Sequence, residues 1–195
     1  MHIIVKFLLI IVFIFLNSCS KDEKKISIIE EKEINLQMID AYKEGVKALE
    51  EGDVIFAAKK FNEAEILFPQ SEWAPKSVLM AAYSYYSQNY YGDAIYELER
   101  FIKTYPNDQR LSYAHYLLAI CYYEEVIDEK KDLGPLVKAQ SEFKFIIKNY
   151  PDSDFALDSK FKLDLINDVL ASKEIYLGRY YIKREKWVAA LNRFK

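Results

Sequence analysis

The chain has 195 residues, of which 27 are lysine or arginine and 30 are aspartate or glutamate, so its formal net charge is −3 at pH 7. This length is enough for one hydrophobic core or a short array of repeats. The acidic balance gives no indication of a nucleic-acid-binding protein. Five glycines and five prolines are too few for an all-β protein, which needs a turn about every ten residues.

The first eighteen residues are typical of a secretory signal. Lys6 makes the amino-terminal region positive, residues 7–16 form an almost unbroken apolar run, and residues 21–23 are charged. A transmembrane helix would need about 20 apolar residues, so an export signal is the better interpretation. Residues 16–19, Leu-Asn-Ser-Cys, resemble the bacterial lipobox. The resemblance implies that Cys19 carries lipid and becomes the first residue after cleavage.

An ordinary signal peptide in which Cys19 is incidental is the alternative. Two or three acyl chains hold a protein on a membrane durably, whereas a single chain does not. Ser20 stands where inner-membrane lipoproteins often carry Asp, which by resemblance implies the outer membrane, with the protein facing the periplasm. We predict a signal peptide over 1–18, a lipidated linker over 19–35 and a repeat domain over 36–195. With Cys19 lipidated, no disulfide is available to Cys121.

Three segments share an apolar pattern that predicts helices ended by proline. Each has a small residue, apolar residues four, seven and eleven positions later, and proline at the twelfth position. This spacing places one stripe along a helix, and the proline ends the helix because its ring removes a backbone donor. Polar residues after each proline suit the start of the next helix. The stripes are Ala57, Phe61, Ala64 and Phe68; Ala94, Leu98, Phe101 and Tyr105; and Ala139, Phe143, Ile146 and Tyr150.

A partner helix is expected before each stripe. Gly45 and Ala82 precede the first residues of the first two stripes by 12 positions, and such small residues let two antiparallel helices approach closely. The order Leu-Gly, Tyr, Ala, aromatic residue resembles the tetratricopeptide repeat, which has a period of about 34 residues. We predict an all-α fold, a tetratricopeptide-repeat solenoid of stacked antiparallel helix pairs, with four to five repeats. The order is clearest at Leu177, Gly178, Tyr181, Ala190 and Phe194, and the third copy carries extra residues that we assign to a charged loop over 128–135.

Residues 154–182 contain no proline, so we predict one unusually long helix that begins near Ser153 or Asp154. Lys195 then falls in mid-helix. Because a solenoid needs a cap over its last apolar face, we expect the sequence to be a fragment whose last turns fray. The apolar residues that keep the helical rhythm are Phe161, Leu165, Val169 and Leu170.

From about residue 8 onward the chain resembles the BamD family of lipoproteins, part of the machine that folds β-barrels into the outer membrane. The lipobox, the repeats, the insertion and above all residues 187–193, Trp-Val-Ala-Ala-Leu-Asn-Arg, carry this resemblance. It implies a scaffold whose partners are a BamA-like barrel protein, the other lipoproteins of the complex and unfolded outer-membrane proteins. A tetratricopeptide-repeat pilotin or another envelope-assembly lipoprotein is the alternative.

The first helix of each repeat should line an inner surface that binds other polypeptides. Tyrosine suits this role because it combines a large apolar ring with a polar tip and loses little rotamer entropy. By resemblance, the ligand would be the aromatic-ending C-terminal strand of an unfolded outer-membrane protein. The alternative is that these tyrosines pack between helices, as we expect for Tyr85, Tyr122 and Tyr181. The predicted groove residues are Tyr42, Val46, Leu49, Leu79, Tyr83, Tyr86, Tyr116, Ile120 and Tyr123.

Residues 173–195 carry seven basic against two acidic side chains. They form either a solvated helix face or a docking surface for an acidic patch on the barrel partner. We predict Trp187, Asn192 and Arg193 as partner-binding residues, since they lie in the segment that matches the family. A guanidinium can make paired hydrogen bonds to a carboxylate, which lysine cannot copy.

No pattern of catalytic residues is present. His115 is the only histidine after the signal, and Cys121 is most simply a small buried side chain. Glu97 and Glu99 are expected on solvated helix faces. There is no glycine-rich phosphate loop and no paired metal-ligand spacing in the sequence, so we predict no enzyme activity, no metal and no cofactor.

Overall fold

The computed structural model describes residues 28–126 and 132–195. The chain divides into a unit of residues 1–33 and a unit of residues 34–195, and the second unit contains the helices discussed below. The predicted signal peptide and Cys19 lie outside the described residues. None of the helices in the described ranges combines the length and the apolar content needed to cross a membrane.

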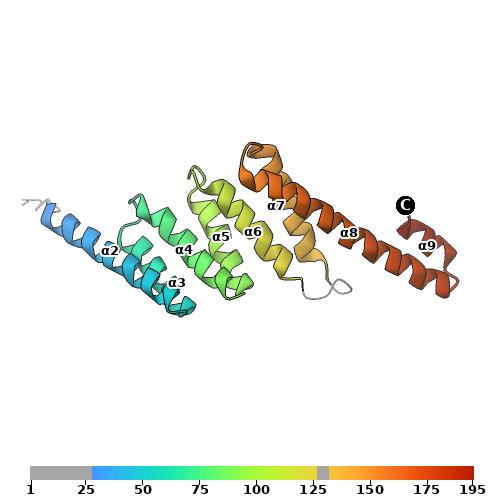
Figure 1. The fold of residues 1–195 in the computed structure, drawn as a ribbon, viewed down its shortest axis with the longest axis horizontal. Coiled ribbons are helices and arrows are strands. Elements are labelled where there is room, and N and C mark those ends of the chain that lie inside the picture. The colour runs from blue at the N-terminus through green and yellow to red at the C-terminus, as the bar shows by residue number, and fades with distance from the viewer. Residues whose placement is uncertain (1–27, 127–131) are drawn as a thin grey trace, which may run out of the picture. The chain divides into compact units, whose positions relative to one another are not determined.

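The described residues form helices joined by short turns, and they include no strand (Figure 1). Consecutive helices from α3 to α9 pack against each other in pairs, and α6 also contacts α8. The predicted all-α fold of stacked helix pairs is confirmed. Helix α2 begins within the segment predicted as a linker. The bounds are α2 Ile28–Glu50, α3 Val54–Leu67, α4 Trp73–Ser87, α5 Tyr91–Thr104, α6 Leu111–Glu124, α7 Gly134–Asn149, α8 Asp154–Lys183 and α9 Trp187–Arg193.

The three predicted stripes form the core. Helices α3, α5 and α7 each end two residues before the proline that follows them, as the sequence predicts. Between them these helices bury the first three residues of every stripe completely, which removes most of their apolar surface from water. These residues are Ala57, Phe61, Ala64, Ala94, Leu98, Phe101, Ala139, Phe143 and Ile146.

The turn between the two helices of a repeat recurs in the same form. Gly52, Asn89 and Glu185 occupy it with φ values of 85°, 64° and 57°. The next residue in each case donates its N–H to a carbonyl five residues earlier, as from Tyr90 to Tyr85 at 3.0 Å. This is the Schellman arrangement, which satisfies carbonyl groups at a helix end. The left-handed residue reverses the chain and lets the second helix return against the first.

Small residues bring the paired helices together where the repeat pattern predicts them. A Cβ atom on Gly45 of α2 would lie 2.9 Å from two ring carbons of Phe61 on α3. A Cβ atom on Gly178 of α8 would likewise overlap the ring of Phe194, which follows α9. Ala82 on α4 is completely buried.

The long helix is confirmed as α8, and the side chain of Ser153 caps it by accepting a hydrogen bond from the N–H of Ala156 at 3.2 Å. Of the four apolar residues that keep the predicted helical rhythm, Val169 and Leu170 pack against the core, whereas Phe161 and Leu165 are exposed. The buried positions of α8 include Ala156, Ser159 and Ile166. The helical spacing predicted the helix, but it did not indicate which of its faces is packed. Residues 128–131 of the predicted loop lie outside the described residues, and its last two residues are helical, because α7 begins at Gly134.

Candidate functional site

Two hollows lie next to each other on the surface made by α2, α4 and the start of α6. The first, of about 280 Å³, is lined by residues of α2 and α4, and the second, of about 290 Å³, by residues of α4 and the start of α6. We call these the α2–α4 hollow and the α4–α6 hollow. The side chain of Lys76 lines both and thus forms the wall between them. The α2–α4 hollow contains Ile39, Tyr42, Lys43, Val46, Trp73 and Lys76; the α4–α6 hollow contains Lys76, Leu79, Met80, Tyr83, Arg110 and Tyr113.

Aromatic rings hold the α2–α4 hollow in shape. The ring of Tyr42 meets those of Phe61 and Trp73 edge to face, with centroids 5.2 Å and 5.1 Å apart. Phe61 is completely buried, so Tyr42 rests on the core on one side and supports Trp73 on the other. Edge-to-face pairs of this kind each contribute roughly 0.5–1.5 kcal/mol beyond area burial. These contacts position the rings of Tyr42 and Trp73 in the wall of the hollow.

Lys76 places a positive charge at the boundary of the two hollows. Its Nζ lies 4.7 Å from the ring centroid of Trp73 and 5.3 Å from that of Tyr42. Within the described residues no carboxylate forms an ion pair with it. Arg110, in the neighbouring wall, differs because its Nε donates to Asp108 Oδ1 at 2.8 Å. The aromatic faces hold the ammonium group in position and leave its charge without an anionic partner there.

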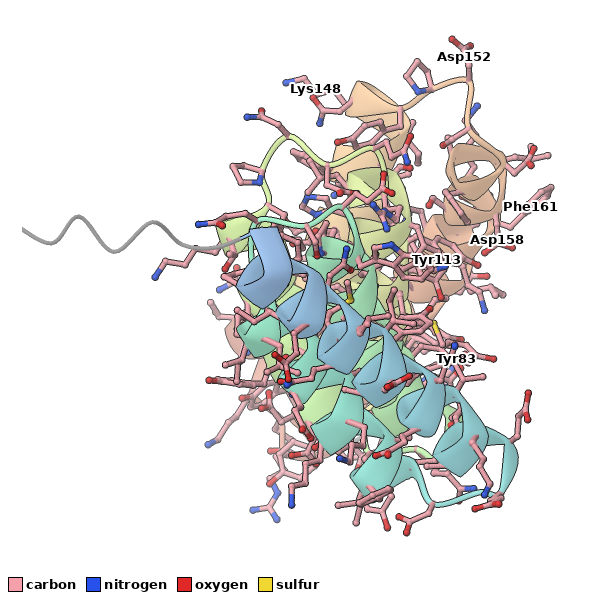
Figure 2. All side chains as sticks on the ribbon, turned by 90° about the vertical axis from the view of Figure 1, so that its left-hand side faces the viewer. Tyr83, Tyr113, Lys148, Asp152, Asp158 and Phe161 are labelled. Atoms are coloured by element: carbon pink, nitrogen blue, oxygen red, sulfur yellow. The ribbon has the colours of Figure 1, made fainter. Side chains whose placement is uncertain are left out.

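The same surface continues from α6 to α8. The hydroxyl of Tyr116 donates to Asp158 Oδ2 at 2.6 Å, and its ring stacks on Phe155 with centroids 5.0 Å apart. Burial raises the pKa of the Tyr113 hydroxyl to about 12. Figure 2 shows Tyr83, Tyr113, Asp158 and Phe161 following one another along one side of the molecule. The first helices of successive repeats thus share one aromatic surface.

The predicted groove residues divide into three groups. Tyr42, Val46, Leu79 and Tyr83 line the hollows. A second group lies beside them: Tyr86 contacts the ring of Tyr83, with centroids 6.3 Å apart, and Tyr116 faces α8 as described. The third group packs towards the core and consists of Leu49, Ile120 and Tyr123, the last with the Lys162 ammonium over its ring.

The sequence reasoning missed several lining residues. Lys76 precedes Leu79 by three positions and Tyr83 by seven, and Tyr113 precedes Tyr116 by three, so helical spacing alone would have placed them on the predicted face. Extending the predicted groove face of each helix by one turn would therefore have included Lys76 and Tyr113. The other missed residues are Ile39, Lys43, Trp73, Met80 and Arg110.

The predicted partner-binding residues lie on and near the short helix α9. Trp187 and Asn192 are exposed, and Arg193 already has an acidic partner within the chain. Its Nη1 lies 3.2 Å and 3.4 Å from the two carboxylate oxygens of Glu174, and this hydrogen bonding raises the pKa of Arg193 above its usual value. Trp187, Val188 and Leu191 leave this end of the described chain with a broad apolar surface.

Glu97 and His115 lie away from the hollows, and each has a polar partner. The prediction for Glu97 is wrong, because it is buried between α3 and α5, where Arg100 bridges it to Glu65 and Asn62 donates to it. A helix face that looks solvated in the sequence is here covered by the preceding repeat. His115 is mostly buried, with Nδ1 2.7 Å from Glu142 Oε2.

The described residues contain no group of three or more histidine, cysteine, aspartate or glutamate side chains placed to hold a metal ion. Cys121 is completely buried, as predicted, and burial raises the pKa of its thiol to about 12. A thiol with such a pKa stays protonated near neutral pH and is a poor nucleophile.

Residues 35–195 match the model of the YfiO family, which is described as an outer membrane lipoprotein. The chain belongs to the YfiO family. Among its YfiO-family relatives is the outer membrane protein assembly factor BamD of Caulobacter vibrioides, 36% identical over 178 residues, which cover 91% of this chain and 57% of the relative. BamD of Rickettsia prowazekii is 35% identical over 154 residues, or 79% of this chain and 61% of the relative.

BamD of Xylella fastidiosa is more distant, at 24% identity over 196 residues that cover 95% of this chain and 65% of that protein. The resemblance predicted from residues 187–193 and the repeat pattern is confirmed by these matches. The chain spans 57% and 61% of the length of the Caulobacter and Rickettsia relatives.

Proposed function

We propose that this YfiO-family chain acts in a scaffold lipoprotein of outer-membrane β-barrel assembly, and that its two hollows bind segments of unfolded outer-membrane proteins. The family description and the relatives' name, outer membrane protein assembly factor, support the process. The observation that carries the binding role is the pair of aromatic hollows with the ammonium of Lys76 between them, which has no carboxylate partner in the part of the chain that the structure describes.

The chemistry of the hollows suits a strand that ends in an aromatic residue. A cavity of about 150 Å³ holds a benzene molecule, so each hollow has room for one aromatic side chain. An extended strand points alternate side chains to one side, so two of them can enter neighbouring hollows. Lys76 would then pair with the terminal carboxylate of the client.

The test is the affinity of a fluorescent peptide copied from the last strand of an outer-membrane protein. Tyr83→Ala combined with Tyr86→Ala removes aromatic surface, and Lys76→Met removes the charge while keeping an apolar stem. Since a buried aromatic side chain contributes about 1.5–3 kcal/mol, we expect a loss of roughly 10- to 100-fold for the tyrosine pair. Tyr96→Ala is the control, because Tyr96 is 67% exposed on α5 and lines neither hollow. Unchanged affinity in both groove variants would refute the proposal.

We propose that Trp187, Asn192 and Arg193 contact the barrel-forming partner. An acidic side chain of that partner would replace or join Glu174 at Arg193. Arg193→Lys should weaken co-purification of a barrel protein with periplasmic repeats after mild detergent extraction, whereas Arg179→Lys, an exposed control on α8, should not. Full retention by Arg193→Lys counts against this contact.

We also propose that Cys19 carries the lipid that holds the protein on the outer membrane, facing the periplasm. Cys19→Ser should then abolish incorporation of labelled palmitate and release the protein from the membrane fraction. Incorporation that persists in this variant would place the lipid elsewhere.

A further inference from the structure

Helix α8 carries an apolar stripe that faces away from the core. Leu157, Phe161 and Leu165 are 60%, 63% and 50% exposed, and they follow one another at a spacing of four residues. Residues four apart lie next to each other on one face of a helix, so the three side chains form one continuous stripe. Figure 2 shows Phe161 projecting from α8. We call this set of three residues the α8 stripe.

Acidic side chains border the α8 stripe. Residues 152–170 contain five aspartates and two lysines. Asp164 and Asp168 are exposed within one turn of Phe161 and Leu165, and neither forms an ion pair within the described residues. Of the two lysines, Lys160 is exposed, and Lys162 is turned aside, with its ammonium 5.0 Å from the ring centroid of Tyr123, so the aspartates outnumber the lysines that can reach a ligand. An apolar patch with a charged rim is typical of an interaction site.

We infer that the α8 stripe and its aspartates form a docking site for a basic amphipathic helix of a partner protein. Helices pack by laying ridges of side chains at i, i+4 and i+8 into the grooves of a neighbouring helix. The three residues of the α8 stripe have this spacing and extend over about 12 Å of the helix. An added strand would need free backbone donors and acceptors, which the interior of a helix does not offer. The aspartates select lysine and arginine on the flanks of the partner helix, and they would repel the anionic head groups of a membrane.

The α8 stripe lies on the same side of the molecule as Tyr83 and Tyr113, but its residues line neither hollow, and the inference concerns a different ligand from the proposed client groove. A client strand would bind Tyr83 and Lys76, whereas the partner helix would bind Phe161 and Leu165. The two sites can therefore be tested separately by mutation and by competition.

The probe is a fluorescent 18-residue peptide of leucine and lysine with its leucines on one helical face. Two control peptides have the same leucines with glutamate in place of lysine, and the same composition in scrambled order. With the full chain, we expect the basic amphipathic peptide to bind at least tenfold more tightly than either control. Added salt should weaken the binding, because ion pairs contribute to it.

Variants of the chain show where the basic peptide binds. Phe161→Ser with Leu165→Ser, and separately Asp164→Lys with Asp168→Lys, should each weaken binding at least tenfold. The matched controls are Tyr96→Ser with Ile66→Ser, equally exposed apolar residues on α5 and α3, and Glu50→Lys with Glu124→Lys, which changes the net charge equally.

Equal binding by the α8 variants, or equal binding of the scrambled or acidic peptide, would overturn the inference. Displacement of the basic peptide by the client-strand peptide would also overturn it, since the α8 stripe would then belong to the client groove. Sedimentation of the chain alone supplies a further check. A dimer that dissociates in the Asp164→Lys, Asp168→Lys variant would show that a second copy, rather than a partner helix, covers the face.

Discussion

Gly45→Ala tests the close approach of α2 and α3 on which the repeat depends. Alanine in a helix interior is normally favoured over glycine by about 1 kcal/mol. Here, however, the new Cβ atom would lie 2.9 Å from Cδ1 and Cε1 of Phe61 and 3.1 Å from its Cζ. The ring cannot move aside easily, because Phe61 is completely buried and in contact with Tyr42.

Overpacking of a core costs about 1–3 kcal/mol, and we expect the upper part of this range at a ring without free space. After subtraction of the helix propensity gain, Gly45→Ala should destabilise the protein by about 1–2 kcal/mol. Gly92→Ala is the matched control, because nothing lies within 4 Å of the new Cβ atom on α5. That substitution should stabilise the protein by about 0.5 kcal/mol.

The assay is urea unfolding followed by circular dichroism, with the thermal midpoint as a second measure. A change of 1 kcal/mol corresponds to about 2–4 °C in Tm for a chain of this size. Phe61→Leu should cost less in the Gly45→Ala background than in the original chain, since the smaller side chain relieves the contact. If both glycine variants change stability in the same direction and to the same extent, the reasoning about helix approach is wrong.

Further substitutions test other parts of the structure. Arg100→Met should lower the free energy of unfolding in urea by about 3–5 kcal/mol, because it leaves the carboxylates of Glu65 and Glu97 buried without their cation. Adding Glu65→Gln should recover part of that loss. Glu185→Gly should stabilise the protein by about 0.5–1 kcal/mol, because φ is 57° at this position and glycine adopts a positive φ without strain. A lower urea midpoint would contradict this expectation. Folding raises the pKa of Tyr113 from about 10 to about 12. The stabilisation linked to its protonated hydroxyl is therefore complete below about pH 10 and is lost as pH rises through about 12. Tyr113→Phe should make the free energy of unfolding depend less on pH in this range. The buried thiol of Cys121 should react with a disulfide reagent at pH 8 only after denaturation, and rapid reaction of the native protein would contradict the packing.

The helices could be predicted from sequence because their signals are local. The stripe from Ala57 to Phe68, the proline after it and the cap at Ser153 each act within one or two turns. The burial of Glu97 could not be predicted in this way, because its partners Glu65 and Arg100 come together only when α3 and α5 pack. Burial of such a carboxylate depends on the neighbouring repeat, which the helix's own pattern does not contain.

The lining of the two hollows could be predicted only in part, for a related reason. Tyr42 and Tyr83 line the hollows as the repeat offsets indicate, but Ile120 packs in the core, since a small rotation of a helix moves a residue from one face to the other. The spacing of Lys76 from Leu79 and Tyr83 places it on the predicted helix face, but its position beside two aromatic rings follows only once Trp73 and Tyr42 are packed around it. Phe161 shares the helical rhythm of α8 with Val169 and Leu170, but this rhythm does not show which side of the helix faces the preceding repeat, and Phe161 is exposed.

The most direct test of the client groove is site-specific photo-crosslinking to an unfolded outer-membrane protein. A photoreactive phenylalanine would replace Tyr83 in one variant and Tyr96 in another, so that both probes are exposed but only the first lies in a hollow. The account predicts crosslinks from position 83 to the C-terminal strand of the client and none from position 96. Equal crosslinking from both positions, or crosslinks from position 83 to segments throughout the client, would contradict it.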